Sequence, residues 1–479
     1  MSEELVFNGI DATTGKYLVP PVEAEVMAAA ISGETRNPEE QEALKLWWQN
    51  YAETNANKQE HFVAKEGTNY KDLASAGWGA IFPYNVDPAI LKALRPLLDW
   101  RKSQAGKLYK EYSGPEGYRF KPDSMYESKD EWLTRHGAGP GPVDPQIVPY
   151  YILLVGDPDQ IPYRFQTQLD VQYAVGRIHF DKAEDYWNYA NSVVNAEKKK
   201  LALGKTAAFF GAANPDDVAT NMSSEQLVKP LAAALAAEQK GWKFNTTAGE
   251  KATKANLSTV LGGKETPALL FTASHGMGFP NGDALQIGNQ GALLCQDWPG
   301  PKAWSKPIGK DFYFAADDLS NDANVFGLVA FFFACYGAGT PKMDDFSKQA
   351  FKTRAEIAPK NFLAHLPQRM LAHPKGGALA VIGHVERAWG YSFSWGKAGA
   401  QLTVFESALK RLLDGYPIGY AFEYFNGRYA ELSSDLTSTL EEIEFGKKVQ
   451  PADLAGMWTA NNDARNYVVL GDPFVKLMA

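Results

Sequence analysis

The stretch VFGLVAFFFACYGAGT, residues 325–340, determines the expected fold. Its first ten residues are almost all apolar and rich in Val and Phe, which is typical of a strand buried on both faces of a parallel sheet. The apolar run stops at Cys335 and breaks into Tyr336-Gly337-Ala338-Gly339. We therefore expect a thiol at the carboxyl end of a central strand, the edge at which open α/β sheets bind ligands.

A second apolar stretch, ALLFTAS at residues 268–274, runs directly into His275-Gly276. Two buried strands would then deliver Cys335 and His275 to the same edge. The 60 residues between them (335 − 275) leave room for a helical crossover and an inserted loop. A thiolate is a nucleophile and an imidazole transfers protons, so this pair is suited to nucleophilic catalysis.

Composition excludes several other classes of function. A net charge of −8 disfavours nucleic-acid binding, and no apolar stretch reaches the roughly 18 residues of a membrane span. The first residues do not resemble a signal peptide, and the two cysteines, Cys295 and Cys335, cannot form a disulfide framework. We expect a cytoplasmic protein in which Cys295 is structural.

The 479 residues suit two fused α/β units rather than one simple core. Strands alternate with helices from residue 76 onward, which favours a mostly parallel sheet flanked by helices. We expect three parts: a helical N-terminal extension at 1–75, whose function the sequence does not reveal, a first, non-catalytic α/β subdomain at 76–204, and a second, catalytic subdomain at 205–479.

Six segments at strand ends resemble, in order, the catalytic region of the gingipain family, cysteine peptidases of the caspase-like clan. They are YILLVGDPDQIP (151–162), AVGRI (174–178), ASHG (273–276), FFFACYG (331–337), ALAVIGHVERAW (378–389) and YVVLGDPFVKL (467–477). The resemblance implies a caspase-like fold of two fused, mostly parallel sheets. It also implies a Cys335–His275 dyad, a thioester acyl-enzyme, and an oxyanion hole formed by the backbone N–H groups of Gly276 and Cys335.

The resemblance is less exact at the residues that would orient the histidine and bind the substrate. The family's acidic partner of the histidine matches Asn214, so Asp216 and Asp217 are the acidic alternatives. The family's pocket-floor aspartate matches Asn221, which would remove the charge partner of a basic substrate side chain. The tentative pocket residues are Asp216, Asp217, Asn221, His384, Glu386 and the family's covering tryptophan, Trp389.

Three functions remain open at this point. The first is a cysteine endopeptidase acting on proteins or peptides, latent until a regulatory partner or self-cleavage in loops 278–320 or 338–360 activates it. The second is a catalytically silent scaffold that recruits partners through residues 1–75, and the third is a thiol acyltransferase or peptide ligase. Family members bind calcium structurally, but no Asp-rich loop here has the ligand spacing of a calcium site, so we predict no metal or cofactor.

Overall fold

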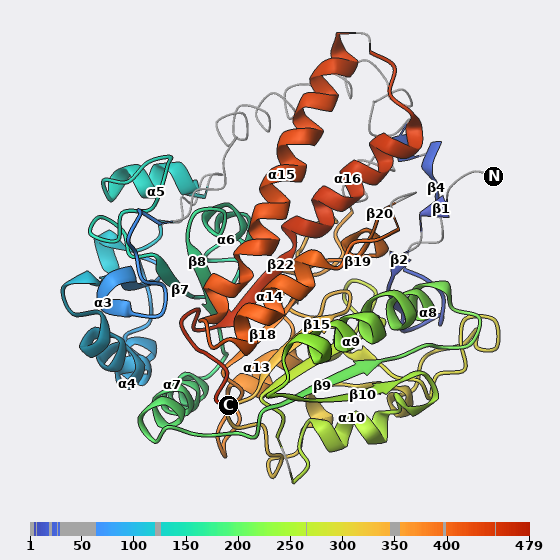
Figure 1. Cartoon of the computed structure of the whole chain (residues 1–479), viewed down its shortest axis with the longest axis horizontal. Coiled ribbons are helices and arrows are strands. Elements are labelled where there is room, and N and C mark those ends of the chain that lie inside the picture. Colours follow the sequence, from blue (N-terminus) through green and yellow to red (C-terminus); the bar gives the residue numbers. More distant parts are fainter. Residues whose placement is uncertain are drawn as a thin grey trace.

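The computed structural model describes residues 4–5, 7–18, 22–25, 27–28, 64–119, 126–264, 266–344, 355–395, 399–445 and 447–479. Its centre is one sheet with the strand order β10-β9-β11-β15-β18-β22-β8-β7-β5-β6 (Figure 1). These ten strands are β10 (Lys243–Ala248), β9 (Thr206–Gly211), β11 (Leu269–Ala273), β15 (Val329–Phe333), β18 (Ala380–His384), β22 (Tyr467–Gly471), β8 (Ala174–Ile178), β7 (Tyr151–Val155), β5 (Trp78–Ile81) and β6 (Tyr109–Tyr112).

The sheet consists of two parallel halves that meet at one antiparallel junction. All neighbouring strands are parallel except β18 and β22. The expected mostly parallel, helix-flanked α/β fold is therefore confirmed, with the two halves fused edge to edge. The C-terminal strand β22 pairs in parallel with β8, so it completes the half that residues 76–204 begin.

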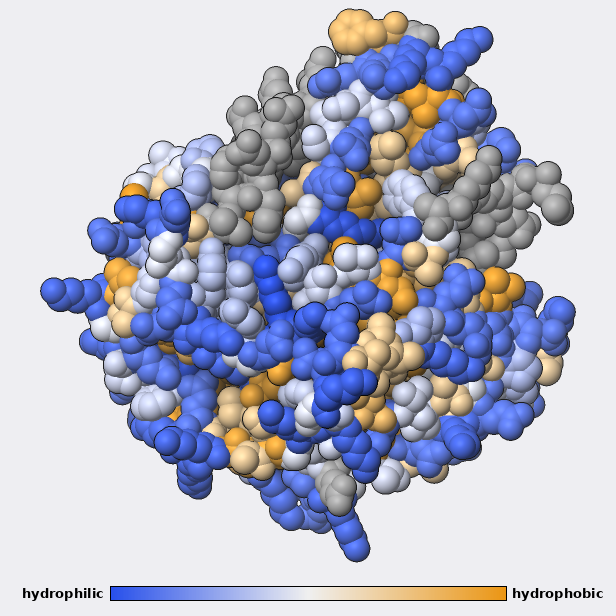
Figure 2. Space-filling model, in the orientation of Figure 1, coloured by the Kyte–Doolittle hydropathy of each residue, from blue (hydrophilic) through white to orange (hydrophobic). Residues whose placement is uncertain are grey.

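Helices cover the faces of the sheet (Figure 1). They are α3 (Leu73–Ala76), α4 (Pro88–Ala105), α5 (Lys129–Arg135), α6 (Tyr163–Leu169), α7 (Ala183–Lys198), α8 (Val218–Ser223), α9 (Lys229–Glu238), α10 (Lys254–Val260), α11 (Gln286–Asn289), α13 (His365–Leu371), α14 (Thr403–Leu413), α15 (Ile418–Glu444) and α16 (Pro451–Arg465). The long helices α15 and α16 pack on each other and project away from the sheet. None of the helices in the described ranges is long and apolar enough to cross a membrane. Figure 2 shows a largely hydrophilic face on which hydrophobic residues form small separate groups.

Short strands lie outside the main sheet. They are β1 (Glu4–Leu5), β2 (Phe7–Asn8), β3 (Ile10–Asp11), β4 (Val22–Glu23), β12 (Met277–Gly278), β13 (Leu293–Leu294), β14 (Tyr313–Phe314), β16 (Gly339–Thr340), β17 (Phe362–Leu363), β19 (Ala388–Trp389), β20 (Ser394–Trp395) and β21 (Gly399–Ala400). Most of the predicted helical part of residues 1–75 lies outside the described residues. Residues 7–18, which are described, form β2, β3 and a turn.

Aromatic side chains hold the central strands in register. Phe271 of β11 lies directly opposite Phe209 of β9 and Phe331 of β15, and the ring centroids are 5.6 and 5.1 Å apart. In the same register, Ala273 at the end of β11 lies opposite Phe333 at the end of β15. The two strands therefore end level with each other, and the residues that follow them emerge side by side.

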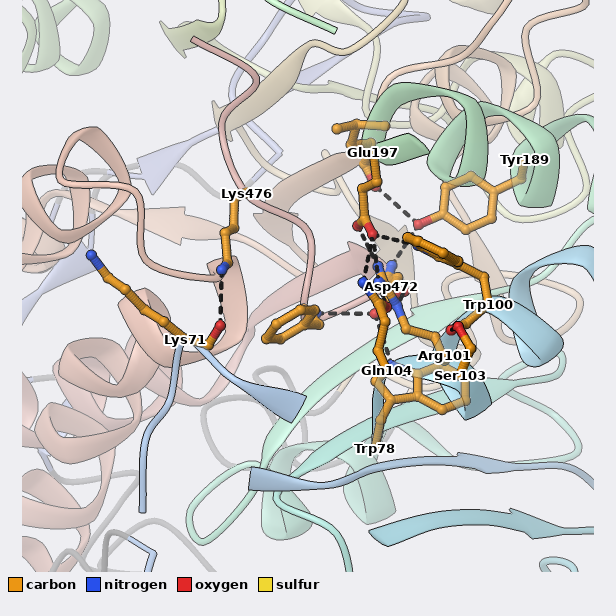
Figure 3. A network of polar contacts seen from close by, with 12 residues as sticks. Lys71, Trp78, Trp100, Arg101, Ser103, Gln104, Tyr189, Glu197, Asp472 and Lys476 are labelled. Atoms are coloured by element: carbon orange, nitrogen blue, oxygen red, sulfur yellow. Dashed lines mark hydrogen bonds and ion pairs between the residues drawn. The ribbon is translucent and has the colours of Figure 1, made fainter. Parts of the chain in front are cut away.

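A buried charge network ties β22 to the first half of the sheet (Figure 3). Asp472, directly after β22, accepts hydrogen bonds from Arg101 Nε at 2.7 Å and from Trp78 Nε1 at 3.0 Å. Arg101 also pairs with Glu197 at 2.6 Å. Burial alone lowers the pKa of Arg101, but the two carboxylates hold it above its usual value. The Gly-Asp-Pro segment at the C-terminus thus has a structural role.

Candidate active site

The level ends of β11 and β15 bring His275 and Cys335 to one edge of the sheet. Each residue lies two positions beyond the last paired residue of its strand. The backbones that follow are in direct contact, because a Cβ added to Gly276 would lie 1.8 Å from the carbonyl oxygen of Cys335 and 2.9 Å from its nitrogen. Only glycine fits at this position, so the backbones of Gly276 and Cys335 lie against each other.

Asp217 is the acidic partner of His275. The imidazole Nε2 lies 2.6 Å from Asp217 Oδ2, and neither side chain is exposed to solvent. Burial alone would raise the pKa of Asp217, but His275 and hydrogen bonds from Thr220 and Tyr17 lower it to about 2. An ionised carboxylate at Nε2 fixes the proton there, so Nδ1 carries the free lone pair. Nδ1 has no hydrogen-bond partner among the described residues.

The position of Asp217 follows from the start of a helix. Asp217 is the N-cap of α8, and its side chain accepts from the backbone N–H of Ala219. The preceding Asp216 has a left-handed backbone with φ of 56° and points to solvent, where it pairs with Lys302 at 3.1 Å. Asn214 is buried and donates to the carbonyls of Cys295 and Trp298. Of the three residues that the sequence offered as partner of His275, the structure places Asp217 there.

Cys335 is enclosed by the backbone around it. Its Sγ accepts a hydrogen bond from the N–H of Ala388 at 3.2 Å, and the side chain is fully buried. Burial is the main cause that raises the pKa of the thiol to about 12. In this closed arrangement the sulfur is therefore a protonated thiol and a poor nucleophile.

The N-terminal segment 7–18 covers the two residues, a contact that the sequence did not predict. A Cβ added to Gly9 would lie 3.0 Å from Cys335 Sγ. The Tyr17 hydroxyl donates to Asp217 Oδ1 at 2.6 Å, and its ring centroid lies 5.9 Å from that of His275. Two-residue strands carry no readable periodicity, so the sequence pattern held no signal for either contact.

Three of the predicted pocket residues lie together beside α8. Asp216, Asp217 and Asn221 line a surface hollow of about 580 Å3, and its other lining residues include Met222, Glu225 and Lys302. The Asn221 amide nitrogen donates to the carbonyls of Asn214 and Asp217, at 2.8 and 2.6 Å. The side chain is therefore oriented by the segment that precedes α8.

The other three predicted pocket residues are buried and do not line this hollow. His384 ends β18, donates from Nε2 to the Asp463 carbonyl at 2.9 Å, and packs on the Tyr467 ring of β22. Glu386 is buried in an ion pair with Arg387. Trp389 is 2% exposed and packs in an apolar cluster with α15 and α16. Pairing of β18 with β22 directs this part of the chain into the core.

Within the described residues, no group of three or more His, Cys, Asp or Glu side chains is arranged to hold a metal ion. Cys295 and Cys335 are both free thiols. The side chains available for chemistry at this edge are thus a thiol, an imidazole and a carboxylate.

Comparisons with known proteins find two similar solved structures and one matching family. The crystal structure of the Arg-specific cysteine proteinase gingipain R is 15% identical over 84% of this chain and 78% of that one, with a TM-score of 0.50. The complex of pro- and mature domains of RgpB from Porphyromonas gingivalis is 13% identical over 84% and 79%, with a TM-score of 0.46. No curated protein matches the chain. The model of peptidase family C25 matches residues 142–478, and the chain accordingly belongs to this family of cysteine peptidases.

Proposed function

We propose that the chain is a cysteine endopeptidase in which Cys335 is the nucleophile, His275 the general acid and base, and Asp217 the residue that orients His275. The observation that carries the proposal is the 2.6 Å contact of Asp217 Oδ2 with His275 Nε2, which leaves Nδ1 without a hydrogen-bond partner among the described residues. This arrangement fits the logic of a nucleophile, a base and an orienting group.

The reaction begins when the thiol proton of Cys335 moves to Nδ1 of His275. The sulfur then bonds to the scissile carbonyl carbon, and the carbonyl oxygen takes up the negative charge. When this intermediate collapses, the C–N bond breaks and His275 returns the proton to the leaving amine. Water next adds to the thioester with proton transfer to His275, the C–S bond breaks, and the acid product leaves.

The backbone amides of Gly276 and Cys335 are the proposed oxyanion donors. Their support is the contact between the two backbones, which only a glycine at position 276 permits. Donors of this kind are typically worth about 2.7–4 kcal/mol each in acyl transfer. The hollow beside α8 is the proposed pocket for the substrate side chain before the cut.

The proposal includes latency, a cytoplasmic location, and protein or peptide substrates. Latency is supported by the complete burial of Cys335 and His275. The cytoplasmic location is supported by two free thiols, which persist in a reducing compartment. A regulatory protein partner would act by uncovering the site.

The test compares wild type, Cys335→Ala and the matched control Cys295→Ala, which removes the other buried thiol. Fluorogenic peptides with Arg, Lys, Asp, Asn or Leu before the cut serve as substrates. Because the site is buried, we expect slow but measurable cleavage by wild type and Cys295→Ala, and none by Cys335→Ala. Cleavage that survives Cys335→Ala refutes the proposal. Addition of an amine acceptor, with mass analysis of the products, distinguishes hydrolysis from peptide ligation.

A further inference from the structure

We propose that residues 7–18, here called the cover segment, inhibit this enzyme from within its own chain. The cover segment occupies the cleft over Cys335 as an added strand, and Tyr17 fastens it to Asp217. This inference rests on the function proposed above, because it explains how the same catalytic site is kept closed.

The first support is steric. Gly9 packs directly against the sulfur of Cys335. A Cβ added to Gly9 would lie 3.0 Å from Cys335 Sγ and 2.8 Å from Leu18 Cδ1. Cys335 and His275 are both 0% exposed. A substrate carbonyl has to reach the sulfur at bonding distance, so it cannot enter while Gly9 is in place.

The second support is the pairing of the cover segment with both rims of the cleft. Its strand β2 pairs antiparallel with β19, whose Ala388 also donates to the Cys335 sulfur. Its strand β3 pairs in parallel with β12, which directly follows His275 and Gly276. Addition of a strand to exposed backbone edges is a common way to bind an extended peptide. The cover segment thus occupies the backbone edges of β19 and β12, with which an extended peptide substrate would pair.

The third support is that the cover segment is folded back on itself. The N–H of Leu18 donates to the Gly9 carbonyl at 2.9 Å, and that of Asp11 donates to the Lys16 carbonyl at 2.8 Å. The Asp11 carboxylate also accepts from the Thr13 backbone at 2.7 Å, which stabilises the turn. The cover segment thus holds Gly9 in an internally bonded hairpin.

Tyr17 links the cover segment to the catalytic residues. Its hydroxyl donates to Asp217 Oδ1 at 2.6 Å. Burial and the neighbouring carboxylate raise the pKa of Tyr17, so the hydroxyl remains a donor. Tyr17 and Gly9 belong to one hairpin, in which Ile10 pairs with Tyr17. Movement of the cover segment away from the sulfur therefore also breaks the hydrogen bond between Tyr17 and Asp217. Tyr17 is thus a fastening residue, one whose hydrogen bond stabilises the closed state.

Two variants test the inference. Gly9→Val places a branched side chain against the sulfur, and Tyr17→Phe removes only the hydroxyl. The matched controls are Gly241→Val, since nothing lies within 4 Å of a Cβ at that position, and Tyr84→Phe, on an exposed tyrosine. Melting temperatures verify that each variant is folded.

The first readout is the rate at which iodoacetamide alkylates Cys335, followed by mass spectrometry of the cleaved peptides. It does not require turnover, and buried Cys295 serves as an internal reference in every sample. The second readout is the rate of peptide cleavage. We expect Tyr17→Phe to raise both rates about tenfold or more, through loss of a charge-assisted hydrogen bond. Gly9→Val should raise them further, and the controls should leave them unchanged.

The outcomes separate this inference from the proposed function. If wild type is alkylated and cleaves as fast as both variants, the cover segment does not inhibit and the inference is overturned, while the peptidase proposal stands. Rapid alkylation of Gly9→Val without any cleavage supports the cover segment and refutes the peptidase. A fall in the activity of Tyr17→Phe would contradict its role as a fastening residue. That single-atom variant keeps the inference testable if Gly9→Val does not fold.

Discussion

Replacement of Asp217 by Asn tests the proposed orientation of His275 most directly. The amide has the size of the carboxylate and is an equally good N-cap, so α8 keeps its start. The carboxylate has donors at both oxygens: His275 and Thr220 at Oδ2, and Tyr17 and the Ala219 N–H at Oδ1. An Asn side chain must direct its NH2 group toward one of these two pairs of hydrogen-bond donors.

Both orientations of the amide impair catalysis. With NH2 toward His275, Nε2 has to accept a hydrogen bond instead of donating one, so the ring proton moves to Nδ1, which then cannot take the proton of the thiol. With NH2 toward Tyr17, the hydrogen bond to His275 survives, but the charge that stabilises the imidazolium is lost. General acid–base catalysis contributes about 10²–10⁴-fold, and we expect a loss of kcat/KM within that range.

The assay measures kcat/KM of Asp217→Asn in a Gly9→Val background, where the cover segment does not limit the rate. Asp322→Asn is the control, because this exposed carboxylate pairs with Lys375 and does not line the hollow beside α8. We expect the control to retain the activity of its parent. An Asp217→Asn variant that stays within about threefold of its parent, with an unchanged melting temperature, refutes the assigned role.

Three further changes have defined outcomes. Gly276→Ala should abolish cleavage, since its Cβ would lie 1.8 Å from a backbone oxygen, and a peptide-cleavage assay checks this. Arg101→Met leaves Asp472 as an unpaired buried carboxylate and should cost about 3–5 kcal/mol in urea unfolding, whereas Lys410→Met on an exposed pair should cost less than about 1 kcal/mol. Burial raises the pKa of Asp170 from 3.8 to about 8, so the folded protein holds a proton that the unfolded chain releases. Stability should therefore fall as the pH rises from 3.8 to about 8, and Asp170→Asn should remove that fall in pH-dependent unfolding.

The central strands and the ends that carry His275 and Cys335 were predictable from the sequence. Each strand is a largely apolar run that ends in His-Gly or in Cys-Tyr-Gly, a pattern that indicates burial on both faces and a break at the sheet edge. The direction of β22 was not predictable. Its apolar residues fit a buried strand in either orientation, and only its pairing with β18 and β8 decides between them.

Of the three sequence candidates for the partner of His275, the two acidic ones could not be told apart. Asp216 and Asp217 are adjacent and chemically identical, so composition cannot distinguish them. The backbone decides, because Asp216 adopts a left-handed conformation that turns the chain, and Asp217 then begins α8 with its carboxylate inward. The cover segment was beyond prediction, since its contacts join residues more than 200 positions apart through two-residue strands.

The two oxygens of Asp217 separate the catalytic contact from the inhibitory one. Oδ2 contacts His275 and Thr220, whereas Oδ1 receives Tyr17 and the first turn of α8. Release of the cover segment therefore removes a donor from Oδ1 only. The bond to His275 and the cap of α8 can both persist, and the carboxylate stays ionised because those donors remain. Uncovering the site then requires the departure of the segment alone, with the His275–Asp217 pair already in its working arrangement.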